Sequence, residues 1–214
     1  EFNSNHIKNS NFFDIDKNSN YESKLPHMLP KKDDWEKSMS KFGIKNSDHV
    51  VIYDNSDVFS ACRVWYTFLY FNHDPNLVSV LDGGLKKWMV EKKITTTNIK
   101  IFDKSSYLAK ENKELVLSKD QINANIKNKS FALIDARGKE RFLGLKPEAR
   151  KELRSGNIEG SKNLPFTELI NNDRTFKDRE KLISIFNEHK VDPNKRLAFT
   201  CGSGITACDL GLTN

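Results

Sequence analysis

The feature that most constrains the fold of this chain is a pattern that occurs twice: an apolar run typical of a buried strand, a short loop, and an apolar helix. The first copy is Val50–Tyr53, which ends at Asp54 and precedes an apolar stretch over residues 62–69. The second is Leu197–Phe199, followed by a loop and a helix that begins near Ile205. Strands that alternate with helices favour parallel sheets with helices on both faces. The sequence therefore predicts an α/β fold with two such domains.

The length of 214 residues allows two domains of about 100 residues each. We place the first domain at residues 1–94 and the second at residues 116–214. The segment 95–115 mixes Thr, Lys, Asn and Ser with scattered apolar residues such as Ile101. We interpret it as a linker that packs against a domain. Because the chain lacks an initiator Met and stops at Asn214, soon after the second loop, we expect both ends to be truncated.

Composition excludes several classes of partner. The net charge is +6, but no run of five like charges occurs, which argues against a nucleic-acid-binding arm. A mildly basic surface suits small anionic substrates equally well. The longest apolar runs fall far short of the ~18 residues of a transmembrane helix, so we expect no membrane partner. Three cysteines without zinc-ligand spacing favour reduced thiols in a reducing compartment, and we expect a cytoplasmic protein with no metal site.

The loop after the second strand is the most informative segment for chemistry. It consists of Cys201, Gly202, Ser203, Gly204, Ile205 and Thr206. Glycines allow successive amide N–H groups to point at one anion, and the following helix N-terminus adds partial positive charge. These donors stabilise a thiolate, so we predict that Cys201 ionises easily and acts as a nucleophile. A structural thiol beside a glycine turn is the plainer interpretation, but the strand–loop–helix context favours a reactive site.

A cysteine-dependent phosphatase would also hold an anion in a loop after a strand. Such a phosphatase needs an arginine six positions after the cysteine to bind phosphate, and this chain has Ala207 there. The phosphatase interpretation is therefore disfavoured. The other two cysteines, Cys62 and Cys208, lie on apolar helix faces, and we predict that they are buried and inert.

The run Cys201–Cys208 resembles the active loop of the 3-mercaptopyruvate sulfurtransferases, which belong to the tandem-domain rhodanese superfamily. Further motifs of that family occur in its order along the chain: Phe12–Asp16, His27–Pro30, Val51–Asp54, Leu81–Gly84, Asp135–Arg137, Arg141–Phe142 and Asn163–Phe166. The resemblance implies two rhodanese-like domains, of which the first is an inactive copy with Asp54 in place of the cysteine. It also implies that further strands and helices precede Glu1 and follow Asn214.

Two arginines are candidates for substrate binding. The resemblance implies that Arg141 and Arg150 bind the carboxylate and carbonyl of a keto acid, and arginine meets carboxylate oxygens bidentately. From the residues alone, two surface cations on a loop would be the plainer interpretation. We expect Arg137 to fix this loop through Asp135 or Glu140.

The resemblance also pairs Ser203 with His27 and Asp16 of the first domain, in a relay like that of serine proteases, which would lie between the domains. The carboxylate would orient the imidazole, and the imidazole would poise the hydroxyl. The alternative for His27 is a histidine that stabilises the turn at Pro26. The loop residues expected to contact substrate are Gly202, Gly204, Ile205 and Thr206.

The implied reaction moves the sulfur of 3-mercaptopyruvate to a thiol or cyanide through a Cys201 persulfide and releases pyruvate, with no metal or organic cofactor. The acceptor would be thioredoxin or a small thiol. Thiosulfate is the alternative donor, but relatives that prefer it carry basic residues after the cysteine, whereas Gly202 and Ser203 are neutral. A second alternative is a rhodanese-like module that carries a persulfide without turnover and would not need the two arginines.

Overall fold

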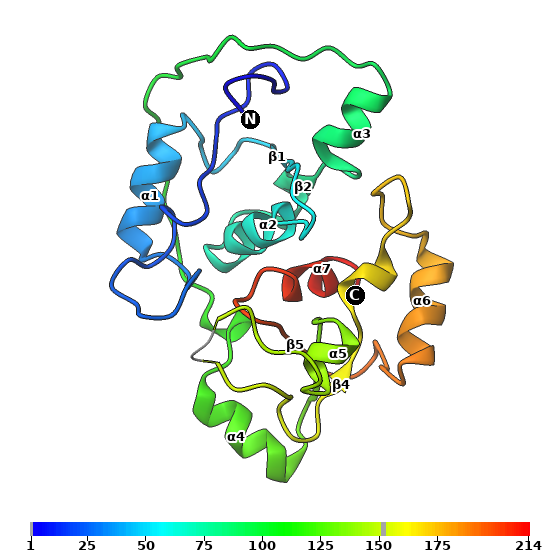
Figure 1. The fold of residues 1–214 in the computed structure, drawn as a ribbon. Coiled ribbons are helices and arrows are strands. Elements are labelled where there is room, and N and C mark those ends of the chain that lie inside the picture. Colours follow the sequence, from blue (N-terminus) through cyan, green and yellow to red (C-terminus); the bar gives the residue numbers. More distant parts are fainter. Residues whose placement is uncertain (1, 151–152) are drawn as a thin grey trace. The chain divides into compact units, whose positions relative to one another are not determined.

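The computed structural model describes residues 2–150 and 153–214, and the chain forms two compact units (Figure 1). Unit 1 holds residues 1–112 and 173–175, and unit 2 holds residues 113–172 and 176–214. Residues 95–112 of the expected linker therefore cluster with unit 1. Tyr107 and Ala109 of this segment are buried in the apolar core of unit 1, which explains the grouping.

In its described residues, unit 1 contains a two-stranded parallel sheet and three α-helices. The elements are α1 Lys32–Lys41, β1 Val50–Ile52, α2 Ala61–Tyr70, a 3-10 helix Pro75–Leu77, β2 Val78–Val80 and α3 Gly84–Val90. Trp35 and Met39 lie on one face of α1 and are fully buried. The Trp35 ring packs against the rings of Phe68 and Phe71 on and after α2. The chain turns after α1 at Gly43, whose φ of +73° suits glycine.

In the part of unit 2 that the structure describes, three parallel strands form a sheet in the order β4–β3–β5. The elements are a 3-10 helix Lys113–Leu115, α4 Lys119–Asn128, β3 Ala132–Asp135, α5 Lys139–Phe142, β4 Lys162–Asn163, a 3-10 helix Phe166–Leu169, α6 Arg179–Glu188, β5 Leu197–Thr200 and α7 Ala207–Leu212. Local signals set the helix starts. Ser118 and Gln121 form a capping box at α4, and the Asp178 carboxylate accepts from the Lys181 amide at α6.

The pairing of β3 with β5 determines where the loops of unit 2 leave the sheet. Asp135, the last residue of β3, is level with Thr200, the last residue of β5. The Ala136 amide also donates to the Thr200 carbonyl at 2.8 Å. Because the two strands are parallel and adjacent, the loops that follow them start side by side at one edge of the sheet. Ligand sites of open α/β sheets lie at this edge.

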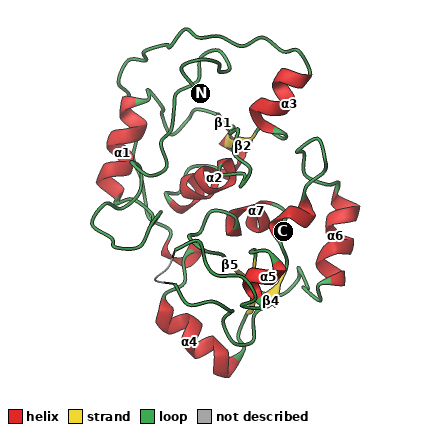
Figure 2. Cartoon of the chain, viewed as in Figure 1, coloured by secondary structure: helices red, strands yellow, loops and turns green. Residues whose placement is uncertain are grey.

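The strands are short compared with the helices, as Figure 2 shows by colour. The longest strands have four residues, whereas α1, α2, α4 and α6 have ten each. No helix among the described residues has both the length and the apolar character to cross a membrane. The prediction of two α/β units with parallel sheets is confirmed.

Candidate active site

Cys201 is the first residue after β5, and a loop of five residues connects it to α7. Gly204 in this loop has a φ of +75°, which side-chain-bearing residues rarely adopt. The Gly204 amide donates to Sγ of Cys201 at 3.1 Å. Cys201 is half-buried and packs against the apolar core of unit 2. The strand end and the glycine turn together place the sulfur among backbone donors.

Two opposing effects set the pKa of the Cys201 thiol. Burial raises the pKa because the thiolate loses water. The Thr206 hydroxyl and the amides of Ser203, Ala207 and Gly204 donate hydrogen bonds to the sulfur and lower the pKa. The donors outweigh burial, so the pKa of Cys201 lies below its ordinary value. The loop therefore stabilises an anionic sulfur at this position.

Thr206→Val should make Cys201 ionise less readily, because valine keeps the shape of threonine but cannot donate to the sulfur. The thiolate is present above the pKa, so a raised pKa moves the rise of alkylation rate to higher pH. At a pH below the wild-type midpoint we expect alkylation by iodoacetamide to slow about tenfold, the scale of one hydrogen bond to a charged group. Thr213→Val removes a hydroxyl that bonds to the carbonyls of Asp209 and Leu210 and serves as control. An unchanged midpoint in Thr206→Val would contradict the assignment.

The Arg141 guanidinium lies beside the cysteine loop. A Cβ atom added to Gly202 would lie 3.1 Å from Nη2 of Arg141, so glycine leaves the space that the guanidinium uses. Arg141 belongs to α5, which follows β3, and the alignment of β3 with β5 brings it to this loop. Its side chain is 36% exposed, which leaves it accessible to an incoming anion.

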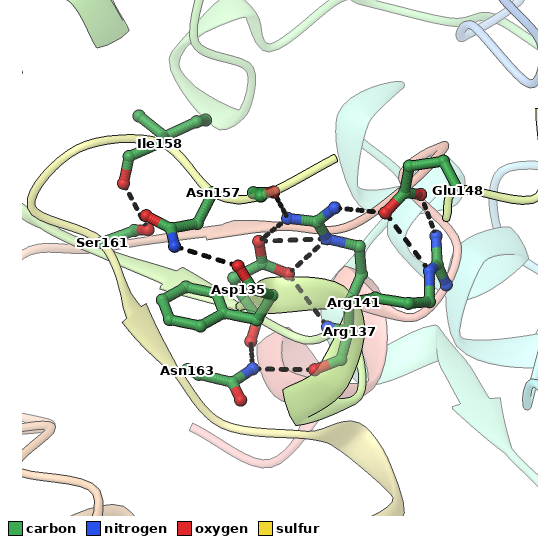
Figure 3. Close-up of polar contacts among 10 residues, drawn as sticks. Asp135, Arg137, Arg141, Glu148, Asn157, Ile158, Ser161 and Asn163 are labelled. Carbon is green, nitrogen blue, oxygen red and sulfur yellow. Dashed lines mark hydrogen bonds and ion pairs between the residues drawn. The ribbon is translucent and has the colours of Figure 1, made fainter. Parts of the chain in front are cut away.

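Glu148 joins two arginines in one cluster of polar contacts, as Figure 3 shows. Its carboxylate accepts from Nη1 of Arg137 at 2.7 Å and from Nη2 of Arg141. Arg137 also pairs with the Asp135 carboxylate at 2.6 Å. The hydrogen bond from Arg141 is the main cause that holds the pKa of Glu148 below its ordinary value, while burial acts in the opposite direction. Two carboxylates therefore balance two guanidiniums at the end of β3.

Of the two partners predicted for Arg137, Asp135 is confirmed and Glu140 is not. Asp135 pairs with Arg137 as expected. Glu140 does not, because the chain after α5 folds back and brings Glu148 to Arg137, while Glu140 pairs with Lys146 at the surface. Glu148 is the functional candidate that the sequence analysis missed. In the sequence, Glu148 is an acidic residue a few positions from several arginines. Spacing alone does not say which of these arginines it pairs with.

Arg150 is half-buried and lies next to residues 151–152, which are outside the described part of the chain. Within residues 2–150 and 153–214, its guanidinium makes no hydrogen bond or ion pair. Among these described residues, no hydrogen bond or ion pair therefore links Arg150 to Arg141 or to Cys201. The Arg150 carbonyl accepts from the Leu153 amide at 3.1 Å.

Asp16 and His27 form a pair in unit 1. Nε2 of His27 lies 3.0 Å from Oδ1 of Asp16. The carboxylate is largely exposed, the imidazole is mostly covered, and His27 has a φ of +55°. Ser203, the third member of the expected relay, belongs to unit 2.

Asp54 in unit 1 occupies the place that Cys201 occupies in unit 2, after a strand and before a helix. One carboxylate oxygen of Asp54 accepts from the Ala61 amide at 2.9 Å and from the hydroxyls of Ser56 and Ser60. A fixed carboxylate therefore satisfies donors at the start of α2. The two units therefore place different acidic side chains, a carboxylic acid and a thiol, at equivalent positions after a strand.

A parallel α/β unit that presents an easily ionised cysteine in a glycine loop beside an arginine defines a rhodanese-like site. A family model described as the rhodanese-like domain matches residues 1–91 and 118–213. The chain therefore belongs to the rhodanese family, and it is a sulfurtransferase enzyme. The expected family and class of activity are confirmed.

Relatives named 3-mercaptopyruvate sulfurtransferase and relatives named thiosulfate sulfurtransferase both resemble the chain over nearly its full length. A mouse (Mus musculus) 3-mercaptopyruvate sulfurtransferase is 37% identical over 99% of this chain and 71% of its own length. A rat (Rattus norvegicus) thiosulfate sulfurtransferase is 36% identical over 99% of this chain and 72% of its own length. The crystal structure of SseA from Escherichia coli, described with the rhodanese fold and mechanism of 3-mercaptopyruvate sulfotransferases, is 31% identical with a TM-score of 0.89, covering 99% of this chain and 78% of that one.

Proposed function

We propose that this chain transfers the sulfur of 3-mercaptopyruvate to a thiol or to cyanide through a persulfide on Cys201, with release of pyruvate. One observation carries the proposal: the hydrogen-bond donors that lower the pKa of Cys201 lie in the loop and at the start of α7, and the same loop borders Arg141. A thiolate suits nucleophilic attack on sulfur, and a guanidinium suits the carboxylate of a keto acid.

The reaction has two steps. The carboxylate and carbonyl of the donor bind to Arg141 and Arg150, and the Cys201 thiolate attacks the donor sulfur. The sulfur–sulfur bond forms while the carbon–sulfur bond breaks, and its electron pair leaves as the enolate of pyruvate, which takes a proton. An acceptor thiolate or cyanide then attacks the outer sulfur and regenerates the Cys201 thiolate.

The remaining candidate residues act on the sulfur. The amide of Gly204 and the hydroxyl of Thr206 hold the thiolate and the persulfide, both of which are anionic. The neighbouring residues Gly202 and Ile205 shape the loop around the donor. We assign the Ser203 hydroxyl to the donor sulfur, in a relay with His27 and Asp16, and the 3.0 Å contact of the last two supports it.

We assign catalysis to the second domain, residues 116–214, and no nucleophile to the first, residues 1–94. The carboxylate of Asp54, which already satisfies the donors at α2, supports this division. The acceptor that we propose is thioredoxin or a small thiol. We propose a reducing compartment such as the cytoplasm, because Cys201 must remain a thiol between turnovers.

Mass spectrometry after treatment with 3-mercaptopyruvate tests the proposal. We expect the full chain to gain the mass of one sulfur atom, and peptide mapping should locate that atom on Cys201. Addition of dithiothreitol should remove it, because a thiol attacks the outer sulfur of a persulfide. No gain of mass, or a sulfur located on Cys62 or Cys208, would count against the proposal.

Thiosulfate is the alternative donor, and a relative named for it is 36% identical to this chain. Thiosulfate carries two negative charges near its sulfur and is better held by cations next to the cysteine, where this chain has Gly202 and Ser203. We therefore expect a higher kcat/KM with 3-mercaptopyruvate than with thiosulfate when both are assayed with cyanide. The reverse order would assign the chain to thiosulfate.

A persulfide-carrying module without turnover is the second alternative. Such a module would need the cysteine loop but not a keto-acid site. The position of Arg141 beside Gly202 favours the enzyme, because it adds an anion-binding group at the loop. A single persulfide without multiple turnovers in the presence of acceptor would favour the module.

A further inference from the structure

Glu148 contacts the Arg141 guanidinium along one edge. Nε of Arg141 donates to Oε1 of Glu148 at 3.4 Å, and Nη2 donates to Oε2. Nε and Nη2 form the side edge of a guanidinium, whereas Nη1 and Nη2 form its end. Among the described residues, the end of Arg141 makes no further hydrogen bond or ion pair. The end of the guanidinium is therefore available for a ligand.

Arg137, the second arginine of the cluster, does not offer a comparable set of donors to a ligand. Its Nε and Nη2 donate to Asp135, its Nη1 donates to Glu148, and its Nη2 also donates to the Gly156 carbonyl. Its side chain is 10% exposed, against 36% for Arg141. The cluster therefore contains one arginine committed to the protein and one that keeps donors for a ligand.

We propose that Glu148 is a positioning residue: it fixes the side edge of Arg141 and so directs the end of that guanidinium toward the carboxylate of the sulfur donor. The inference rests on the proposed function, in which Arg141 binds that carboxylate. Glu148 provides a rigid support because its own side chain is 3% exposed and is anchored by Arg137 at 2.7 Å. A guanidinium held along one edge loses less conformational entropy on binding than one on an unrestrained side chain.

A purely electrostatic role for Glu148 would have the opposite effect. A carboxylate in contact with Arg141 reduces the positive potential that attracts a donor anion. Removal of the charge would then lower the KM for the donor, whereas removal of an anchor raises it. The direction of the change in KM therefore separates positioning from charge.

Steady-state kinetics of the full chain with 3-mercaptopyruvate provides the test. For Glu148→Gln and Glu148→Ala we expect KM to rise about tenfold, with a much smaller change in kcat, because a coupled neighbour of a binding residue has been removed. Glu140→Gln is the matched control, since Glu140 belongs to the same segment and pairs with Lys146 at the surface. An unchanged or lower KM in Glu148→Gln overturns the proposal.

A double-mutant cycle asks whether Glu148 acts through Arg141. In an Arg141→Gln background, Glu148→Gln should no longer raise KM, because the guanidinium that it positions is absent. A general loss of structure would raise KM by the same factor in both backgrounds. An undiminished rise in the Arg141→Gln background therefore overturns the proposal.

A second measurement does not depend on the identity of the donor. Iodoacetate carries a carboxylate and iodoacetamide does not, so the ratio of their alkylation rates at Cys201 reports on the anion site at the loop. We expect Glu148→Gln to lower this ratio, and an unchanged or higher ratio overturns the positioning role. Should the wild-type chain form no persulfide from 3-mercaptopyruvate, the proposed function fails, while this ratio still decides the role of Glu148.

Discussion

Replacement of Cys201 by serine should abolish sulfur transfer. The serine hydroxyl fits the same space but cannot form a persulfide. It also stays protonated, even beside the loop donors that stabilise a thiolate. Loss of a catalytic nucleophile reduces turnover on the order of 10⁶-fold, so we expect no detectable thiocyanate from 3-mercaptopyruvate and cyanide. The measurement is a coupled assay of pyruvate and thiocyanate, with mass spectrometry of the protein after exposure to the donor.

The matched control for this experiment is Cys208→Ser. Cys208 is buried, and its Sγ donates to the Gly204 carbonyl at 3.3 Å, a hydrogen bond that a serine hydroxyl can replace. We expect this variant to gain one sulfur on Cys201 as the wild-type chain does. Turnover that persists in Cys201→Ser would show that another group is the nucleophile.

Arg141→Gln should produce the second large effect, a rise in the KM for 3-mercaptopyruvate. A hydrogen bond to a charged group contributes about 1.5–3 kcal/mol, which corresponds to a rise of about 10- to 100-fold. The kcat should change less, because the chemistry at Cys201 does not need the guanidinium. Arg141→Lys should recover part of the loss, since it keeps the charge but not the fork.

Arg154→Gln is the control for net charge, because Arg154 is an exposed cation of the same segment. It should leave KM close to the wild-type value. Arg150→Gln should raise KM in the same direction as Arg141→Gln if both guanidiniums bind the donor. Equal KM values for Arg141→Gln and Arg154→Gln would remove Arg141 from the binding site.

The strands next to the site were predictable because each is an apolar run with a clear end. Val50–Tyr53 was expected and β1 covers Val50–Ile52, while Leu197–Phe199 was expected and β5 covers Leu197–Thr200. The strand Val78–Val80 was not predicted, because Val-Ser-Val lacks the continuous apolar run that marks Val50–Tyr53. It forms through parallel pairing with β1, which no local pattern encodes.

The donors around the cysteine could also be predicted. The Ser203, Gly204 and Ala207 amides and the Thr206 hydroxyl all lie within six positions of Cys201, so strand, glycines and helix start suffice to place them. Burial could not be predicted in the same way, because it depends on how the loop packs on the core of unit 2. The balance between burial and donors therefore came from the structure.

The sequence by itself determined the fold class, the family and the hydrogen-bond donors around the Cys201 sulfur, because these follow from short-range order along the chain. The tertiary structure decided which arginine keeps donors for a ligand. Local spacing suggested Glu140 as a partner for Arg137, but the fold of the following loop brings Glu148 to both guanidiniums. Arg141 reaches Gly202, which is far away in the sequence, because β3 and β5 are neighbours in one parallel sheet. Contacts of this kind depend on chain segments that meet only after folding.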